Sequence, residues 1–156
     1  LGHGLGIGSG IAFAKKIDKK NNINVFVLLG DGECYEGSIW EAAMFANHHH
    51  LDNLIAIVDR NRLTVLDFTE NIIKLNPFKK KWASFGWNVI EVDGHNIQKI
   101  SDKIKYAKQL KNKRPTVIIA NTIKGKGISY MENKIKWHHG VPSKDLLKNL
   151  NEELEI

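Results

Sequence analysis

Two short apolar runs, each followed at once by a polar turn, constrain the fold of this chain more than any other feature. Residues 25–29 (Val-Phe-Val-Leu-Leu) precede the turn 30–32 (Gly-Asp-Gly), and residues 54–58 (Leu-Ile-Ala-Ile-Val) precede the turn 59–61 (Asp-Arg-Asn). Uninterrupted β-branched and aliphatic runs of this length are typical of strands buried on both faces of a parallel sheet. We therefore expect both runs to lie inside a sheet that helices cover on its two sides.

Helical patterns alternate with these strands along the chain, because apolar residues recur there at spacings of three and four. The expected helices are 11–17, 38–50, 77–85 (with Gly86 as its stop) and 96–110, and the further strands are 87–92 and 116–120. Alternating strands and helices define an α/β domain with a mainly parallel sheet in a three-layer arrangement, joined by right-handed crossovers. We expect a single domain over residues 1–156; the pattern from residue 146 onward is too short to assign.

The composition excludes several classes of protein. Hydrophobic residues make up 42% of the chain and charged residues 26%, which is the balance of a folded globular domain and not of a disordered chain. The longest apolar run has only five residues, far fewer than the roughly 20 that a membrane-spanning helix needs, so no membrane partner is expected. Cys34 is the only cysteine, which suits a reducing compartment, and we expect a cytoplasmic protein.

The basic charge of the chain does not indicate a nucleic-acid partner. Lys and Arg total 23 and Asp and Glu total 17, so the formal net charge is +6. A nucleic-acid surface needs clustered Arg and Lys with exposed aromatic residues between them, whereas these residues are mostly dispersed lysines. Solvated helix faces explain the charge better, and a non-catalytic binding domain remains only a remote alternative.

The two polar turns carry the chemistry that the sequence predicts. Ligands of parallel sheets bind beyond the carboxyl ends of the strands, and Asp31 and Asn61 each follow one of two neighbouring strands. Carboxylate and amide oxygens suit Mg²⁺ or Ca²⁺, and one carboxylate leaves the remaining ligand positions to anionic oxygens such as those of a diphosphate. Gly30 and Gly32 would let the backbone approach that diphosphate. In the alternative interpretation Asp31 only caps backbone amides; the second strand with its Asn favours the metal site.

These residues and their flanks resemble the thiamine-diphosphate motif of the transketolase family, particularly the amino-terminal subunit of split, two-polypeptide transketolases. The matching segments are 30–33 (Gly-Asp-Gly-Glu), 36–43 (Glu-Gly-Ser-Ile-Trp-Glu-Ala-Ala), 51–55 (Leu-Asp-Asn-Leu-Ile), 85–87 (Phe-Gly-Trp), 92–95 (Val-Asp-Gly-His), 122–127 (Thr-Ile-Lys-Gly-Lys-Gly) and 137–142 (Trp-His-His-Gly-Val-Pro). The resemblance extends from Leu1 to about Pro142. It implies a thiamine-diphosphate-binding fold, namely that of the domain that holds the diphosphate end of the cofactor.

The resemblance also implies roles for individual residues. Asp31 and Asn61 would bind the metal through side chains and Leu63 through its carbonyl, with Mg²⁺ or Ca²⁺ as the ion. The implied contacts to thiamine diphosphate are Gly2, Gly30, Asp31, Gly32, Asn61 and Ile123. Glu36 matches an acidic residue that links two cofactor sites across a dimer interface. His139 matches the active-site histidine, although the adjacent His138 leaves the choice between the two open.

The implied activity is the transfer of a two-carbon ketol unit from a ketose to an aldose, with sugars or sugar phosphates as substrates. Another thiamine-diphosphate enzyme, such as the α-subunit of a 2-oxo acid dehydrogenase or deoxyxylulose-phosphate synthase, is the alternative. The family's upstream region and its pyrimidine-binding domain have no counterpart in this sequence. We therefore expect a chain that is incomplete at its N-terminus, is inactive alone, and works in a hetero-oligomer built on a dimer with a pyrimidine-domain subunit.

Overall fold

A four-stranded parallel sheet forms the centre of the molecule. The computed structural model describes residues 1–19 and 22–153. The strands are β1 (Val25–Gly30), β2 (Leu54–Arg60), β3 (Asn88–Asp93) and β4 (Thr116–Asn121), in the spatial order β1-β2-β4-β3. Each of the four expected strands is present to within two residues at either end, and the α/β class and parallel sheet are confirmed.

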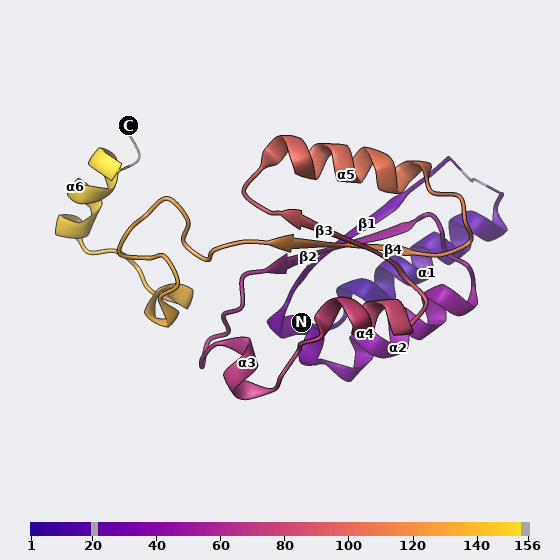
Figure 1. The fold of residues 1–156 in the computed structure, drawn as a ribbon, viewed down its shortest axis with the longest axis horizontal. Helices are drawn as coiled ribbons and strands as arrows, with labels where there is room; N and C mark the ends of the chain where they lie inside the picture. Colours follow the sequence, from indigo (N-terminus) through magenta and orange to yellow (C-terminus); the bar gives the residue numbers. More distant parts are fainter. Residues whose placement is uncertain (20–21, 154–156) are drawn as a thin grey trace.

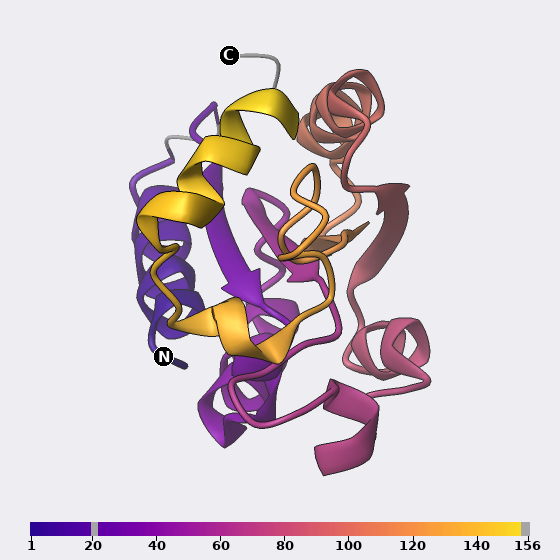
Figure 2. The ribbon, with the colours of Figure 1, turned by 90° about the vertical axis from the view of Figure 1, so that its left-hand side faces the viewer.

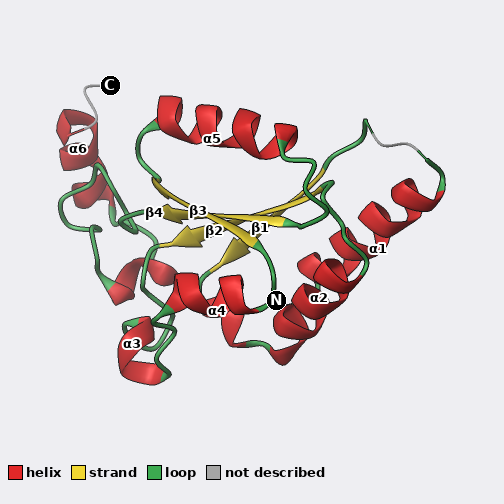
Figure 3. Cartoon of the chain, turned by 45° about the vertical axis from the view of Figure 1, so that its right-hand side comes forward, coloured by secondary structure: helices red, strands yellow, loops and turns green. Residues whose placement is uncertain are grey.

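Helices lie on both faces of this sheet and give it three layers (Figures 1 and 3). The helices are α1 (Gly4–Ile17), α2 (Gly37–His48), α3 (Thr69–Ile72), α4 (Phe78–Ser84), α5 (Ile97–Gln109) and α6 (Lys144–Glu153), with 3-10 turns at Gly32–Tyr35 and Ile135–His138. Helices α1, α2 and α4 lie below the sheet in Figure 1 and α5 lies above it. Within the described residues, no helix combines the length and hydropathy that crossing a membrane requires.

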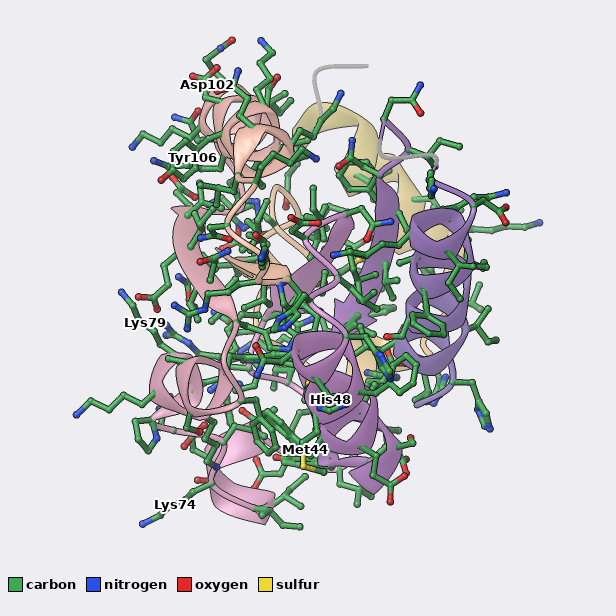
Figure 4. The ribbon with its side chains drawn as sticks, turned by 90° about the vertical axis from the view of Figure 1, so that its right-hand side faces the viewer. Met44, His48, Lys74, Lys79, Asp102 and Tyr106 are labelled. Carbon is green, nitrogen blue, oxygen red and sulfur yellow. The ribbon has the colours of Figure 1, made fainter. Side chains whose placement is uncertain are left out.

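Two hydrophobic clusters hold the layers together. The larger one, between the sheet and α1, α2 and α4, contains two buried tryptophans, Trp82 and Trp87. The smaller one lies under α5 and joins Ala107 to Ile118 of β4. On the opposite side of α5, Asp102 and Tyr106 project away from the sheet (Figure 4). This helix is amphipathic, as the spacing of its apolar residues predicts.

Helix α1 begins at Gly4, seven residues before the helix expected from the sequence. Alternate glycines lower helix propensity, but here one of them permits close packing. A Cβ on Gly8 would lie 2.3 Å from Cγ2 of Val27, so only glycine lets α1 approach β1 this closely. Tertiary packing therefore overrides local propensity in this segment.

The expectation that residues 25–29 are buried on both faces is wrong. Val27 and Leu29 are buried against α1, but Phe26 is 46% exposed and Leu28 is 74% exposed. The reason is the position of α5, which contacts β3 and β4, whereas β1 is the edge strand farthest from β3. The expectation holds for β2, in which Leu54 through Ala56 are fully buried.

Candidate cofactor site

The carboxyl ends of the strands form one edge of the sheet, and the predicted site lies there. Parallel pairing of β1 with β2 places Gly30 opposite Asp59, so the turn 30–32 lies beside the turn 59–61. Between them is a cavity of about 450 Å³. Its walls come from both turns, residues 63–66, α3, and two side chains from later in the chain, Lys124 and His138. Figure 2 views the molecule from this end, with α6 and the turn Ile135–His138 in front of the strands.

Asp31 lies on the wall of this cavity and is 1% exposed. Its Oδ1 accepts a hydrogen bond from the Gly32 N–H at 2.8 Å, and its Oδ2 accepts one from the Arg62 N–H at 2.6 Å and one from Nη1 of Arg60 at 3.0 Å. Burial raises the pKa of Asp31 above its ordinary value, and these donors oppose that rise. The carboxylate is thus desolvated but held in place by three donors.

Asn61 lies on the same wall and is oriented by its neighbours. Its Oδ1 accepts a hydrogen bond from the Leu63 N–H at 3.0 Å, and its Nδ2 donates to Oδ2 of Asp59 at 3.1 Å. The other oxygen of Asp59 accepts a hydrogen bond from the Thr122 hydroxyl. Asp59 therefore fixes which end of the Asn61 amide is the oxygen, and it ties β2 to the segment after β4.

Gly2 is held close to the turn 30–32 by Glu33, a residue that sequence reasoning did not single out. The Gly2 N–H donates to Oε1 of Glu33 at 2.8 Å, and the Gly30 N–H donates to Oε2 at 3.2 Å. The Ser38 hydroxyl donates to the Gly2 carbonyl at 2.8 Å. Gly2 has a φ of +82°, and a Cβ there would lie 2.9 Å from both Glu36 and Ser38. Only glycine tolerates both the positive φ and the close approach of Glu36 and Ser38.

Arg60 and Lys124 are two further residues at the candidate site that sequence reasoning did not single out. Arg60 is 3% exposed at the end of β2, where it contacts Asp31 and the carboxylate of Glu70. A buried arginine needs carboxylate partners, so its place two residues after an apolar run was the available signal. Lys124 brings a positive charge to the cavity wall; no local pattern distinguishes it from the other lysines.

Four predicted residues do not line the cavity: Gly2, which is described above, and the three that follow. Glu36 is exposed at the N-terminal end of α2. The Ile123 N–H donates to Nε2 of His95 at 2.7 Å, and it is the next residue, Lys124, that reaches the wall. His138 and His139 are both exposed, but it is His138 that lines the cavity, and the two ring centroids lie 4.8 Å apart. Burial, followed by the charges of Lys124 and His139, lowers the pKa of His138.

The donor set of the cavity fits a divalent cation held together with an anionic ligand. Within the described part of the chain, no group of three or more His, Cys, Asp or Glu side chains is placed to hold a metal ion. Asp31 and Asn61 offer two hard oxygen donors. The cradle formed by Gly30 and Gly32 is narrow, since a Cβ on Gly32 would lie 3.2 Å from Thr64. Oxygens of a diphosphate would complete such a shell, and Lys124 would offset their charge.

This fold and this cavity define a class of α/β domains that bind ligands beyond the carboxyl ends of a parallel sheet. Residues 1–154 match the family described as transketolase, thiamine diphosphate binding domain. The chain belongs to the transketolase family through this domain.

Curated relatives support the assignment. The chain is 45% identical to a subunit of the apulose-4-phosphate transketolase of Phocaeicola vulgatus over 99% of its own length and 56% of the relative. It is 41% identical to a subunit of the 6-deoxy-6-sulfo-D-fructose transketolase of Clostridium sp., again over 99% of this chain and 56% of the relative. The chain therefore spans about half the length of these relatives.

Solved structures agree with the fold. The transketolase of Campylobacter jejuni superimposes with a TM-score of 0.81 at 29% identity, over 98% of this chain and 25% of that one. The transketolase of Leishmania mexicana gives a TM-score of 0.83 at 26% identity, over 99% of this chain and 24% of that one.

Proposed function

We propose that this chain is the thiamine-diphosphate-binding part of a transketolase that transfers a two-carbon ketol unit from a ketose to an aldose. The observation that carries the proposal is the convergence of Asp31 and Asn61 on one cavity at the ends of β1 and β2. Membership of the family and the identity to subunits of two transketolases support it. The names of those relatives favour a sugar or sugar phosphate as substrate.

Different residues of the cavity would bind the metal and the diphosphate of the cofactor. Asp31 and Asn61, together with the Leu63 carbonyl, would hold Mg²⁺ or Ca²⁺, and the backbone of residues 30–32 would contact the diphosphate. Lys124 adds a positive charge to the cavity lining. When bound, thiamine diphosphate supplies the electron sink for cleavage of the C–C bond. The chain's own contribution is to bind and orient that group and to place proton donors near it.

The remaining roles concern groups that meet in an assembled enzyme. His139 is proposed to contact the hydroxyls of the ketose donor, and Gly2 and Ile123 to lie against the cofactor. Glu36, exposed next to Gly2, is proposed to link two cofactor sites across a dimer. The word "subunit" in the relatives' names favours a partner chain that supplies the pyrimidine-binding domain and completes a hetero-oligomer.

The test is an activity assay of the full-length protein with and without a candidate pyrimidine-domain subunit. Mg²⁺ and thiamine diphosphate are supplied, and ketol transfer from a ketose phosphate is compared with turnover of pyruvate. Ketol transfer only in the presence of both subunits supports the proposal. Turnover of pyruvate alone would assign the chain to another thiamine-diphosphate enzyme, and failure to bind the cofactor in the assembled protein would leave a non-catalytic domain.

A further inference from the structure

The two oxygens of the Asp31 carboxylate are not equivalent. Oδ2 accepts two hydrogen bonds, from Nη1 of Arg60 at 3.0 Å and from the Arg62 N–H at 2.6 Å. Oδ1 accepts only one, from the Gly32 N–H at 2.8 Å. A carboxylate oxygen has about two lone-pair sites, so Oδ2 is fully used within the protein. Oδ1 alone keeps a lone pair for an external cation.

Arg60 cannot easily leave this position, because both terminal nitrogens of its guanidinium are engaged. Nη1 also donates to the Thr69 hydroxyl at 3.0 Å, and Nη2 donates to Oε1 of Glu70 at 2.7 Å. The guanidinium carbon lies 5.1 Å from the centre of the Phe78 ring. Arg60 is 3% exposed, so its guanidinium is shielded from water. The planar, forked donors of arginine suit such a rigid arrangement.

The second donor to Oδ2 is fixed as well. Arg62 has a φ of +65°, an unusual conformation for a residue other than glycine. In this conformation its N–H points at Asp31 and its carbonyl accepts a hydrogen bond from the Thr69 N–H at 2.9 Å. Thr69 thus anchors both donors of Oδ2, one through its hydroxyl and one through its backbone.

We propose that Arg60 sets the metal preference of this site, by occupying Oδ2 of Asp31 and so restricting the carboxylate to one-oxygen coordination through Oδ1. The inference rests on the proposed function, because it concerns the metal that would accompany thiamine diphosphate. Mg²⁺ requires a compact, near-octahedral shell, whereas Ca²⁺ takes six to eight oxygens and often binds both oxygens of one carboxylate. A carboxylate held to one oxygen favours Mg²⁺ over Ca²⁺. Arg60 is in this sense a positioning residue, since it acts through Asp31.

The ratio of the Ca²⁺ and Mg²⁺ affinities separates this role of Arg60 from a pure charge effect and from a general effect on stability. Loss of the positive charge of Arg60 changes the attraction for both divalent ions in the same direction, so the charge effect largely cancels in the ratio. A general loss of stability also affects both ions alike. Freeing a lone pair on Oδ2 is different, because it offers a second ligand that Ca²⁺ uses more readily than Mg²⁺.

The experiment uses the full-length protein in complex with its partner chain, stripped of metal with a chelator. Mg²⁺ or Ca²⁺ is titrated at a fixed concentration of thiamine diphosphate, and cofactor binding is followed by calorimetry or by quenching of tryptophan fluorescence. The quantity compared is the half-saturating concentration of Ca²⁺ divided by that of Mg²⁺. Arg60→Met should lower this ratio about tenfold, the scale on which residues behind a metal ligand act. Arg60→Lys keeps the positive charge but loses the planar set of guanidinium donors, and it should give an intermediate ratio.

Arg114→Met is the matched control, because Arg114 is an exposed arginine whose Nε donates to the Gly86 carbonyl outside the cavity; its ratio should equal that of the unmodified protein. An unchanged ratio in Arg60→Met overturns the inference and leaves the proposed function intact. Should Arg60→Met fail to fold, Arg60→Lys decides by the same measurement, and an unchanged ratio there overturns the inference too. Absence of metal-dependent cofactor binding in the unmodified protein would instead overturn the proposed function.

Discussion

The Glu33 carboxylate accepts the Gly2 N–H at 2.8 Å and in this way joins the beginning of α1 to the loop that follows β1. Its other oxygen accepts the Gly30 N–H, so one side chain satisfies two backbone donors from segments far apart in the sequence. Glu33 also forms part of the cavity wall. The shape of the cofactor site therefore depends on a side chain that the proposed chemistry does not use.

Replacement of Glu33 by Gln should destabilise the protein by about 1–3 kcal/mol, the usual cost of leaving a partly buried donor unsatisfied. A glutamine amide has one acceptor oxygen, and its NH₂ group would face the second backbone N–H. The free energy of unfolding from denaturant titration measures the effect. Glu41→Gln on the exposed side of α2 is the control, with an expected change within about 0.5 kcal/mol. Equal values for the two variants would show that the Glu33 bridge contributes nothing.

Asp31→Asn should weaken Mg²⁺-dependent binding of thiamine diphosphate by more than about 100-fold, because even residues behind a metal ligand change affinity 10- to 100-fold. The substitution removes the only predicted anionic side-chain ligand while keeping the size of the side chain. Calorimetric titration of the assembled protein measures the affinity. Asp102→Asn, on the outer face of α5 (Figure 4), removes the same charge far from the cavity and should change nothing. Unaltered cofactor affinity in Asp31→Asn would contradict the metal site.

His139→Ala should lower kcat by about 100-fold or more while cofactor affinity changes little, as expected for a residue that contacts the donor during the reaction. His138→Ala serves as the neighbouring control and should have a much milder effect on kcat. Steady-state kinetics of the assembled enzyme distinguish the two. Because His138 is the histidine that lines the cavity in this structure, the reverse order of effects would move the catalytic role to His138.

Cys34 should resist thiol reagents in the folded protein and react quickly after unfolding. Burial, reinforced by the charges of Asp31 and Glu33, raises the pKa of its thiol from 9.0 to about 12, so the reactive thiolate is scarce at pH 8. The folded state keeps a proton that the unfolded chain loses, so the contribution of Cys34 to stability falls as the pH rises from 9 towards 12. Colorimetric thiol titration with and without denaturant provides the measurement. Rapid native labelling at pH 8 would refute the assignment.

Gly8→Ala should destabilise the protein by about 1–3 kcal/mol, the typical cost of overpacking a core contact, because the added methyl would overlap Val27. Gly10→Ala tests the same change on the same helix where a Cβ has open space around it. This control should stabilise α1 by up to about 1 kcal/mol through higher helix propensity. Thermal unfolding of both variants gives the comparison, and equal effects would mean that the contact with β1 does not constrain residue 8.

The convergence of Asp31 and Asn61 was predictable from the sequence because it follows from strand register alone. Two adjacent parallel strands that each end in a polar turn bring those turns to one edge, whatever the helices do. The Arg60 network was not predictable in the same way. Its partners Thr69 and Glu70 belong to α3, a four-residue helix, and so short a helix has no periodic pattern to reveal it.

The errors in the predicted fold have a common physical origin in tertiary packing. Local propensity argued against a helix at Gly4, but contact with β1 favours it. The apolar run of β1 indicated burial on two faces, yet burial of Phe26 and Leu28 depends on which strands α5 covers. The role of His139 is not among these errors: it was assigned by resemblance and stays a prediction, and no local pattern shows whether His139 or His138 faces the cavity.

The apolar outer face of β1 has a practical consequence for handling this domain by itself. Phe26 and Leu28 are exposed on β1, which has no second neighbouring strand among the described residues. Exposed apolar edge strands promote self-association. Concentrated solutions of the isolated domain should therefore aggregate through this edge. Leu28→Lys should keep such a preparation monodisperse in light scattering and leave the cavity untouched, because Leu28 is not among the residues that line it.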